Sequence, residues 1–526
     1  MTNLRELLLA RAHDTRPGVR SREQSWTWAE HVAESSARAE AVRSLLDPDR
    51  PPHVGVLLDN TPEMVMALSA AALGGYVVVG LNTTRRGGSL LADIRTGDCQ
   101  LVLTDSAHAG LLDGLDLGGH VVRVDAPTWL AGFETGASAP SSTSEQVDVS
   151  DTDLFMLIFT SGTSGEPKAV RVTHEKVWFP GLVLADMFGI TDADVLYVSM
   201  PLFHSNAIMA GYGLALNSGA TLALGERFSA SGLLDDVRFF GATYLNYVGK
   251  PLAYVLATPE RADDADNPLR IAFGNEANEK DVEAFSQRFG CRVYDGFGST
   301  ENAVIISRVE GTPPGSLGRP HDGVKVLHQA TGEECPPAVF GAGGEVTNLD
   351  DAVGEFVNTT GAGQFAGYYN DDAATAERMR GGMYWSGDLG YLDADGFAYY
   401  AGRTGDWLRV DGENLAAAPV ERILLRHPDV SRAAVYAVPD ERAGDQLVAA
   451  LVLHDDATLD PAGFEKFLAA QADLGPKQWP RYVRLSTALP QTATNKVLKR
   501  ELVREGLDAD DPLWCRDKRG TSYTNP

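Results

Sequence analysis

The chain has 526 residues, which is too many for one hydrophobic core, so two or more domains are expected. Its apolar content of 44% and charged content of 22% are typical of a soluble globular protein. The net charge of −27 argues against nucleic acid and against anionic membrane surfaces as partners.

The cysteines and the first residues indicate the compartment. The four cysteines lie far apart and show no CxxC spacing, which predicts reduced thiols in a cytoplasmic protein without a zinc site. They are Cys99, Cys291, Cys335 and Cys515. Residues 1–10 predict an amphipathic helix. Because this segment carries an acid and lacks a long apolar core, it does not resemble a secretory signal.

One uncharged segment, residues 64–82, has the apolar content of a membrane span. It contains Gly74-Gly75 and then the β-branched run Val77-Val78-Val79. We therefore predict a buried helix, a glycine turn and a buried strand, with a transmembrane helix as the alternative.

From about residue 25 to residue 300, helical patterns alternate with short Val, Leu and Ile runs. Residues 54–58, 101–104 and 221–224 are such runs. This alternation predicts α/β layers with mostly parallel sheets. The polar, small-residue stretch 136–145 predicts a surface linker.

The loop at residues 159–168 combines hydroxyl side chains, glycines and a lysine. An apolar run, 154–159, leads into it, and residues 168–172 alternate like a second strand. A glycine-rich turn between strands can direct backbone N–H groups and hydroxyls at phosphate oxygens. The familiar nucleotide-binding loop instead ends in Gly-Lys-Ser/Thr and opens a helix, whereas Pro167 precedes the lysine here. The alternative is a solvated Ser/Gly turn.

The sequence pattern changes in the C-terminal part of the chain. From about residue 305 to residue 400, Gly and Pro punctuate short strands, which predicts a small β-barrel-like subdomain. After Gly402, a helix over 417–425 and a strand over 433–438 indicate a compact α/β tail. We place the domain boundary at Thr404-Gly405, which divides the chain into 1–403 and 404–526.

Five motifs in this order resemble those of the adenylate-forming superfamily, which comprises acyl-CoA synthetases, peptide-synthetase adenylation domains and luciferases. The motifs are residues 159–168, 295–301, 385–389, 402–406 and 491–500. Together they cover nearly the whole chain. The hinge and C-terminal segments look most like the fatty-acid-transport-type, very-long-chain acyl-CoA synthetases.

The resemblance implies an α/β fold with a large N-terminal domain and a small, mobile C-terminal α+β domain. It also implies an acid–thiol ligase that forms AMP and uses ATP, Mg²⁺ and CoA. Such an enzyme converts a carboxylic acid to an acyl-adenylate and then to a thioester, with domain rotation between the steps. Neither nucleic acid nor a membrane span is expected, and monomer and homodimer both stay open.

The resemblance also implies a role for each charged residue of the motifs. Glu301 would bind magnesium, since a hard cation prefers carboxylate oxygen, and Thr300 would contact the α-phosphate. Lys496 would lie between the substrate carboxylate and the α-phosphate. Asp388 would accept both ribose hydroxyls, and Arg403 would add positive charge beside the ribose and the phosphates. Taken singly, Asp388 is more typical of a turn aspartate, and Glu301 could be a helix-start carboxylate. Arg403 and Lys496 taken singly could be surface cations, the commonest environment of such residues.

The remaining implied residues form the walls of the site. Phe297 would stack on adenine, opposite residues 275–277. The nucleotide-binding set is Thr160, Ser161, Gly162, Thr163, Ser164, Gly165, Lys168, Asn275, Glu276, Ala277, Asp295, Gly296, Phe297, Gly298 and Ser299. The acyl and pantetheine tunnels would be lined by Phe203, His204, Asn206, Gly274 and Gly298.

Three departures from the family pattern bear on function. Gly405 stands at the hinge, where the family usually has Asp or Lys. Glu166 places an acid inside the phosphate loop, and Asn302 replaces a common glycine, so its side chain could crowd ATP. These departures leave open a ligase that only thioesterifies a preformed acyl-adenylate. A non-catalytic binding protein of the same fold and an adenylation domain that loads a carrier protein also stay open.

The acid itself is predicted to be apolar, because we find no acidic side chain placed to hold a substrate amine. A fatty acid and a bulky polycyclic acid of specialised metabolism both fit.

Overall fold

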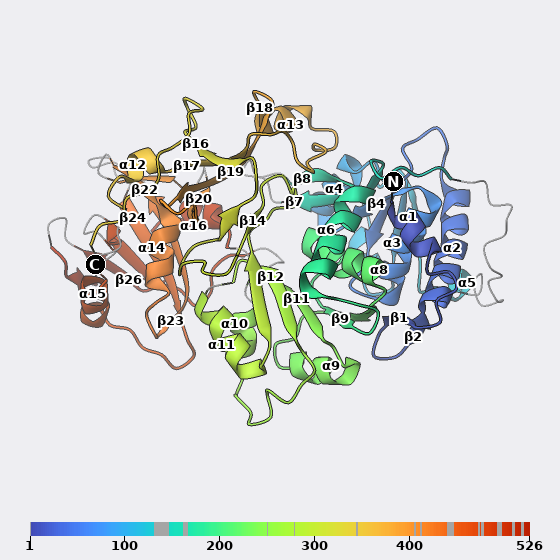
Figure 1. Cartoon of the computed structure of the whole chain (residues 1–526), viewed down its shortest axis with the longest axis horizontal. Helices are drawn as coiled ribbons and strands as arrows, with labels where there is room; N and C mark the ends of the chain where they lie inside the picture. The colour runs from blue at the N-terminus through green and yellow to red at the C-terminus, as the bar shows by residue number, and fades with distance from the viewer. Residues whose placement is uncertain are drawn as a thin grey trace. The chain divides into compact units, whose positions relative to one another are not determined.

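The computed structural model describes residues 2–130, 147–160, 167–249, 251–277, 279–342, 346–403, 407–410, 413–438, 446–471, 474, 478–491, 497–507, 511–516 and 520–525. The chain forms two compact units (Figure 1). Unit 1 contains Met1–Ala303 and Gln364–Glu377, and unit 2 contains Val304–Gly363 and Arg378–Pro526. The predicted hinge at Thr404-Gly405 and the predicted linker at 136–145 lie outside the described residues, so both stay predictions.

Unit 1 is built on two sheets. The strands of the six-stranded sheet are β3 (His53–Leu57), β4 (Val77–Gly80), β5 (Leu101–Thr104), β6 (His120–Arg123), β7 (Leu154–Thr160) and β8 (Lys168–Thr173). Their order is β6-β5-β3-β4-β7-β8. The strands of the seven-stranded sheet are β1 (Pro17–Arg20), β2 (Ser25–Thr27), β9 (Val195–Val198), β10 (Thr221–Leu224), β11 (Tyr244–Val248), β12 (Ile271–Asn275) and β13 (Arg292–Gly296). Their order is β13-β12-β11-β9-β10-β1-β2.

Neighbouring strands in both sheets run parallel, apart from the edge pairs β7–β8 and β1–β2. This confirms the predicted α/β layers. Strands such as β3 are buried along their whole length, as expected for parallel strands covered on both faces. The helices of unit 1 are α1 (Leu4–Leu9), α2 (Trp28–Leu45), α3 (Pro62–Gly74), α4 (Gly87–Thr96), η1 (Ala109–Leu112), α5 (Pro127–Leu130), α6 (His174–Phe188), α7 (Ser205–Ala207), the π-helix η2 (Ile208–Gly213), α8 (Leu214–Ser218), α9 (Leu233–Phe240), α10 (Pro251–Leu256) and α11 (Glu279–Phe289).

The uncharged segment 64–82 has the predicted arrangement. Helix α3 ends at Gly74 and is capped by Gly75, whose left-handed φ of 65° suits glycine, and β4 follows. Among the described residues, no helix has both the length and the apolar content needed to cross a bilayer.

The described residues of unit 2 form two five-stranded sheets and two two-stranded sheets. The first sheet, β16-β17-β19-β18 with β20 on β19, is antiparallel and corresponds to the predicted short-strand subdomain. Its strands are β16 (Val324–Leu327), β17 (Gly354–Asn358), β18 (Met379–Arg380), β19 (Met383–Leu392) and β20 (Ala398–Arg403). The second sheet, in the order β23-β24-β25-β26-β27, contains β23 (Val430–Val438), β24 (Gln446–Leu453), β25 (Tyr482–Leu485), β26 (Leu513–Arg516) and β27 (Tyr523–Thr524). The two-stranded sheets are β14 (Ile306–Ser307) with β15 (Arg319–Pro320) and β21 (Trp407–Val410) with β22 (Glu413–Ala416).

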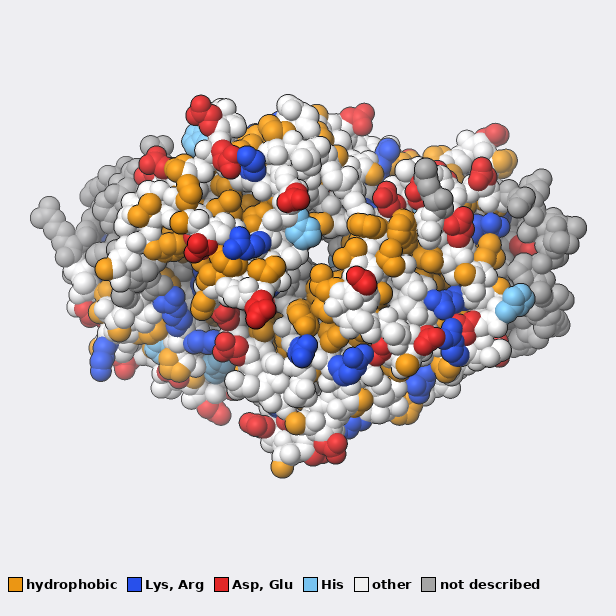
Figure 2. Space-filling model, in the orientation of Figure 1, with side chains coloured by type: hydrophobic (Ala, Val, Ile, Leu, Met, Phe, Trp, Pro, Cys, Tyr) orange, Lys and Arg blue, Asp and Glu red, His pale blue; other side chains and the backbone are white. Residues whose placement is uncertain are grey.

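The helices of unit 2 confirm the α/β character of the C-terminal tail. They are α12 (Leu349–Ala352), α14 (Ala417–Leu424), α15 (Pro461–Ala469) and α16 (Lys499–Glu505), while α13 (Asp372–Arg378) contains residues of both units. The helix predicted over 417–425 is α14, and the strand predicted over 433–438 lies within β23. On the face shown in Figure 2, acidic and basic side chains are interspersed and form no continuous basic stripe.

Candidate active site

The β7–β8 hairpin presents the predicted phosphate loop. The antiparallel register pairs Thr160 with Lys168, and the Thr160 Oγ1 lies 3.5 Å from the Lys168 carbonyl oxygen. The two predicted strands on either side of the loop are therefore confirmed. The loop residues themselves lie outside the described residues: Ser161, Gly162, Thr163, Ser164, Gly165 and Glu166.

Lys168, Tyr368 and Glu301 form a connected cluster beside this hairpin. The Lys168 Nζ lies 5.3 Å from the centre of the Tyr368 ring and 3.7 Å from the exposed carboxylate of Glu377. The Tyr368 hydroxyl donates a hydrogen bond to Glu301 Oε1 at 2.7 Å. Tyr368 thus links the loop lysine to the predicted metal ligand, although no sequence pattern marks this tyrosine as a site residue.

Glu301 fits the requirements of Mg²⁺. Its carboxylate supplies the oxygen donors that this ion prefers, and Tyr368 occupies one oxygen while fixing the carboxylate. A single carboxylate is sufficient because Mg²⁺ usually keeps several waters and takes further oxygens from substrate phosphates. The hydroxyl of the neighbouring Thr300 lies 3.0 Å from that of Ser205.

Asn302 adopts the left-handed backbone conformation, which glycine adopts most easily. Its φ is 52°, which asparagine tolerates better than most residues with a side chain. Its side-chain amide donates a hydrogen bond to Gln364 Oε1. Gln364 and Tyr368 thus hold two successive residues, Asn302 and Glu301, from the same segment of the chain.

We expect Asn302→Gly to accelerate adenylation by up to about tenfold, since it removes the side chain beside Glu301 and keeps the left-handed backbone accessible. Thioester formation from a supplied acyl-adenylate should not change. Pyrophosphate release and thioester formation, measured separately, test this. Crowding by Asn302 is ruled out if the wild-type enzyme already adenylates its acid as fast as the glycine variant.

The carboxyl ends of β11, β12 and β13 meet at one edge of the seven-stranded sheet, where open α/β sheets bind ligands. The predicted adenine wall lies here. The Asn275 amide donates to the Gly296 carbonyl at 2.8 Å, and the Ala277 N–H donates to Asp295 Oδ2 at 2.9 Å. Residues 297–299 follow directly, and a Cβ added at Gly298 would meet no atom within 4 Å.

The structure describes the surroundings of three predicted tunnel residues, Gly274, Phe203 and His204. Gly274 is required by packing, because an added Cβ would lie 2.2 Å from the Tyr247 carbonyl oxygen. Phe203 is buried with its ring 4.6 Å from that of His204. The His204 Nε2 is buried without a hydrogen-bond partner among the described residues, and burial lowers the pKa of this histidine to about 4.

In unit 2, the two predicted ribose-site residues are neighbours. Asp388 and Arg403 are register partners on β19 and β20, and the Arg403 Nε lies 3.2 Å from Asp388 Oδ1. The Tyr400 hydroxyl lies 3.5 Å from the same oxygen. Lys496 and Gly405 lie outside the described residues, so their roles stay predictions.

Lys176, in the first turn of α6, is a buried lysine that no sequence motif indicates. Its side chain is fully buried, and its Nζ has no hydrogen-bond partner among the described residues. Burial lowers the pKa of Lys176 to about 7, and attraction to Glu301 opposes this shift. A lysine in the first turn of a helix is usually exposed to solvent. The burial of Lys176 is therefore evident only from the folded structure.

The pKa of Lys176 predicts a pH-dependent stability. Above pH 7 the unfolded chain, with a lysine pKa near 10.5, binds a proton that the folded protein lacks. Stability should therefore rise with pH from about pH 7 to about pH 9, by at most about 1.4 kcal/mol per pH unit.

Urea unfolding across this range measures the slope. Lys176→Met should reduce it, whereas Lys280→Met, which alters an exposed lysine of α11, should not. An unchanged slope in the Lys176 variant would contradict the assignment.

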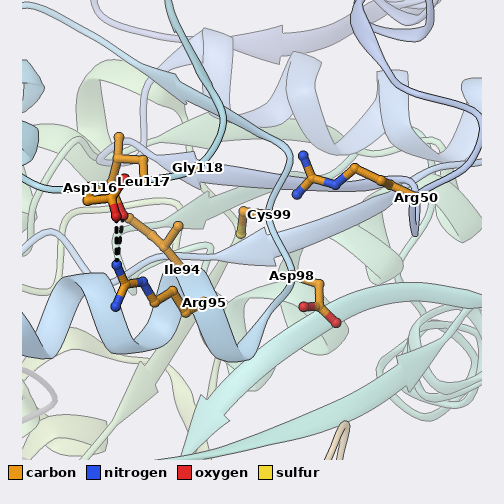
Figure 3. Close-up of a pocket in the computed structure, with 8 residues that line it drawn as sticks. All are labelled: Arg50, Ile94, Arg95, Asp98, Cys99, Asp116, Leu117 and Gly118. Atoms are coloured by element: carbon orange, nitrogen blue, oxygen red, sulfur yellow. Dashed lines mark hydrogen bonds and ion pairs between the residues drawn. The ribbon is translucent and has the colours of Figure 1, made fainter.

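A separate surface pocket of about 350 Å³ lies in unit 1 (Figure 3). It is lined by Arg50, Ile94, Arg95, Asp98, Cys99, Asp116, Leu117 and Gly118. Arg95 and Asp116, two of these lining residues, form an ion pair at 3.3 Å (Figure 3). Because it contains none of the predicted site residues, we place the candidate site at the strand ends and the β7–β8 hairpin instead.

Known proteins resemble this chain over nearly its whole length. The chain is 53% identical over 509 residues to the medium/long-chain-fatty-acid–CoA ligase FadD17 of Mycobacterium marinum, covering 97% of each chain. It is 49% identical over 523 residues to the steroid-22-oyl-CoA synthetase of Rhodococcus jostii, covering 99% of this chain and 94% of that protein.

The fold has solved counterparts as well. The o-succinylbenzoate CoA synthetase (MenE) from Bacillus subtilis, in complex with the acyl-adenylate intermediate OSB-AMP, matches with a TM-score of 0.78 at 27% identity. The match covers 95% of this chain and 98% of that one. The sequence also matches the AMP-binding enzyme family over residues 9–369 and the AMP-binding enzyme C-terminal domain over residues 419–496. The resemblance to adenylate-forming enzymes is thereby confirmed, and the chain belongs to the AMP-binding enzyme family.

Proposed function

We propose that this protein is an acyl-CoA ligase that joins an apolar carboxylic acid to CoA through an acyl-adenylate. The observation that carries the proposal is the cluster of Lys168, Tyr368 and Glu301 beside the phosphate-loop hairpin. It places a cation and a fixed carboxylate together, as a magnesium–triphosphate substrate requires. The relatives named a fatty-acid–CoA ligase and a steroid-22-oyl-CoA synthetase support the same activity.

In the first step, a carboxylate oxygen of the acid attacks the α-phosphorus of ATP, and the bond to the departing pyrophosphate breaks. Lys168 would hold the β- and γ-phosphates as a point charge. Thr300 would donate a hydrogen bond near the α-phosphate, and Lys496 would offset charge between the two reacting oxygens. Mg²⁺, held by Glu301, would neutralise phosphate charge when bound.

In the second step, the CoA sulfur attacks the acyl carbon, the bond to the AMP oxygen breaks, and the thiol proton leaves to solvent. Asp388 would hold the ribose, and Arg403 would orient the carboxylate of Asp388 through the ion pair between the two residues. A rotation about Gly405 would exchange the groups that face the substrate, because glycine absorbs large φ/ψ changes.

The experiment is a pyrophosphate-release screen across carboxylic acids with thioester detection by mass spectrometry. Fatty acids and polycyclic acids form its two main arms, since the two relatives are named for one of each. Pyrophosphate and thioester formation with the same acid support the proposal. No turnover of any acid, and none of a supplied acyl-adenylate, would refute it.

A second candidate is a ligase that catalyses only thioesterification of a preformed acyl-adenylate. The side chain of Asn302, next to the predicted metal ligand, favours this alternative. It predicts thioester formation from the acyl-adenylate without pyrophosphate release from any acid.

A further inference from the structure

Three asparagine side chains form a continuous hydrogen-bonded chain below the predicted adenine wall. The Asn246 Nδ2 donates to Asn206 Oδ1 at 2.7 Å, and the Asn206 Nδ2 donates to Asn275 Oδ1 at 3.2 Å. The Asn275 Nδ2 in turn donates to the Gly296 carbonyl oxygen at 2.8 Å. These hydrogen bonds therefore connect β11, α7, β12 and β13.

The direction of this chain is fixed by its last member. A backbone carbonyl only accepts hydrogen bonds, so Asn275 must present its NH₂ group to Gly296 and its oxygen to Asn206. The same alternation continues to Asn246 and leaves the Asn246 oxygen unused. Asn246 is fully buried, and its Oδ1 has no hydrogen-bond partner among the described residues.

A buried acceptor without a donor is unfavourable, so a donor from outside the described residues is expected there. A second unsatisfied group lies in the same segment as Asn206. The His204 Nε2 is also buried without a hydrogen-bond partner among the residues that the structure describes. Two buried polar groups near one short segment, both without a hydrogen-bond partner among the described residues, are typical of a ligand-binding wall, where a few placed polar groups fix the ligand.

The strand register places Asn246 relative to the adenine wall. Asn246 pairs with Phe273 and Phe273 pairs with Tyr294, so the three form one row across the sheet. Asn275 and Gly296 belong to the next row on the same face, two residues and about 7 Å nearer to the strand ends. An acyl group that extends inward from a carboxylate at the strand ends would therefore reach the row of Asn246.

The rest of this row is aromatic. Phe273 and Tyr294 are half-buried, and the ring of Phe188 lies 5.5 Å from the first and 4.8 Å from the second. An apolar skeleton suits these rings, but a hydrocarbon cannot satisfy the Asn246 oxygen.

We propose that Asn246 is a specificity-determining residue that accepts a hydrogen bond from a hydroxyl group on the acyl part of the acid. The substrate class is therefore an apolar acid that carries a hydroxyl, on either a fatty chain or a polycyclic skeleton. This inference rests on the ligase function proposed above for the same site.

The test compares acids that differ only in their hydroxyl group. One arm uses dodecanoic acid and a positional series of hydroxydodecanoic acids, and the other uses cholanic acid and its ring-hydroxylated derivatives. The wild-type enzyme should prefer at least one hydroxylated acid over its parent by about tenfold or more in kcat/KM for pyrophosphate release. The arm with the preferred acid distinguishes the two skeletons.

Asn246→Leu should abolish this preference, because it should slow turnover of the hydroxylated acid more than turnover of the parent acid. The matched control is Asn267→Leu, which removes another partly buried asparagine whose amide donates to the carbonyls of Asp264 and Phe289. This control should leave the preference unchanged.

Equal kcat/KM for parent and hydroxylated acids in the wild-type enzyme would mean that water satisfies Asn246 and would overturn the inference, even if Asn246→Leu does not fold. The ligase function would survive that outcome. Absence of turnover with every acid would overturn both.

Discussion

Glu301→Gln is expected to slow adenylation by about a hundredfold or more, while thioester formation from a supplied acyl-adenylate stays within about threefold. Glutamine has the size of glutamate and can still accept the hydrogen bond from Tyr368, so the local packing is kept. The substitution removes the charge that would hold Mg²⁺. Pyrophosphate release measured over a range of Mg²⁺ concentrations gives the rate and the metal dependence together.

The chain offers a matched control for this substitution. Glu377 also lies near Lys168, at 3.7 Å, but its side chain is 76% exposed. Glu377→Gln should therefore change adenylation by less than about twofold, since exposed ion pairs contribute little. If the two variants lose adenylation equally, the loss comes from charge around Lys168 and not from a metal ligand. If Glu301→Gln loses both half-reactions equally and remains folded, the assignment is wrong.

The local features of the site could be predicted because they depend on short-range patterns. An uninterrupted apolar run before the loop and an alternating run after it are sufficient to predict the β7–β8 hairpin. Likewise, Gly74-Gly75 before three valines predicted the end of α3 and the start of β4.

Tyr368 could not be predicted in this way. It reaches Glu301 because its backbone lies beside β8, where Val170 and Tyr368 form a bridge and the Arg171 N–H donates to the Gly367 carbonyl. This contact joins segments that are far apart in the sequence and leaves no periodic signal. The same holds for the hydrogen-bonded series from Asn246 to Gly296, which requires three strands and a helix to meet.

Asn302 and the segment that begins near residue 305 have features that depend on the fold as well as on local sequence, whereas the boundary at Thr404-Gly405 stays a prediction. The asparagine was recognised as a departure from glycine, but its left-handed φ and its hydrogen bond to Gln364 depend on the folded loop. The change to short strands near residue 305 can be recognised in the sequence. The unit with which these strands pack cannot be recognised there, because a strand pattern does not indicate which hydrophobic core the strands join. In the structure, residues 304–363 group with the C-terminal unit.

Lys496→Ala is expected to slow adenylation by at least about a hundredfold and to leave thioester formation from a supplied acyl-adenylate within about threefold. The reason is that this cation is proposed to offset charge between the attacking carboxylate and the α-phosphate, a contact that only the first step needs.

The matched control is Lys499→Ala. Lys499 lies three residues further along the same motif, but its Nζ is paired with Glu421 at 2.9 Å within unit 2. Lys499→Ala should lower the thermal stability of the protein and leave the rates of both half-reactions nearly unchanged, because the Lys499 charge is already paired with Glu421. Rates of both half-reactions and thermal unfolding of both variants distinguish the roles. The proposal for Lys496 fails if its variant loses both half-reactions to the same extent, or if Lys499→Ala reproduces its selective loss of adenylation, because a general loss of positive charge in the motif would then explain the effect.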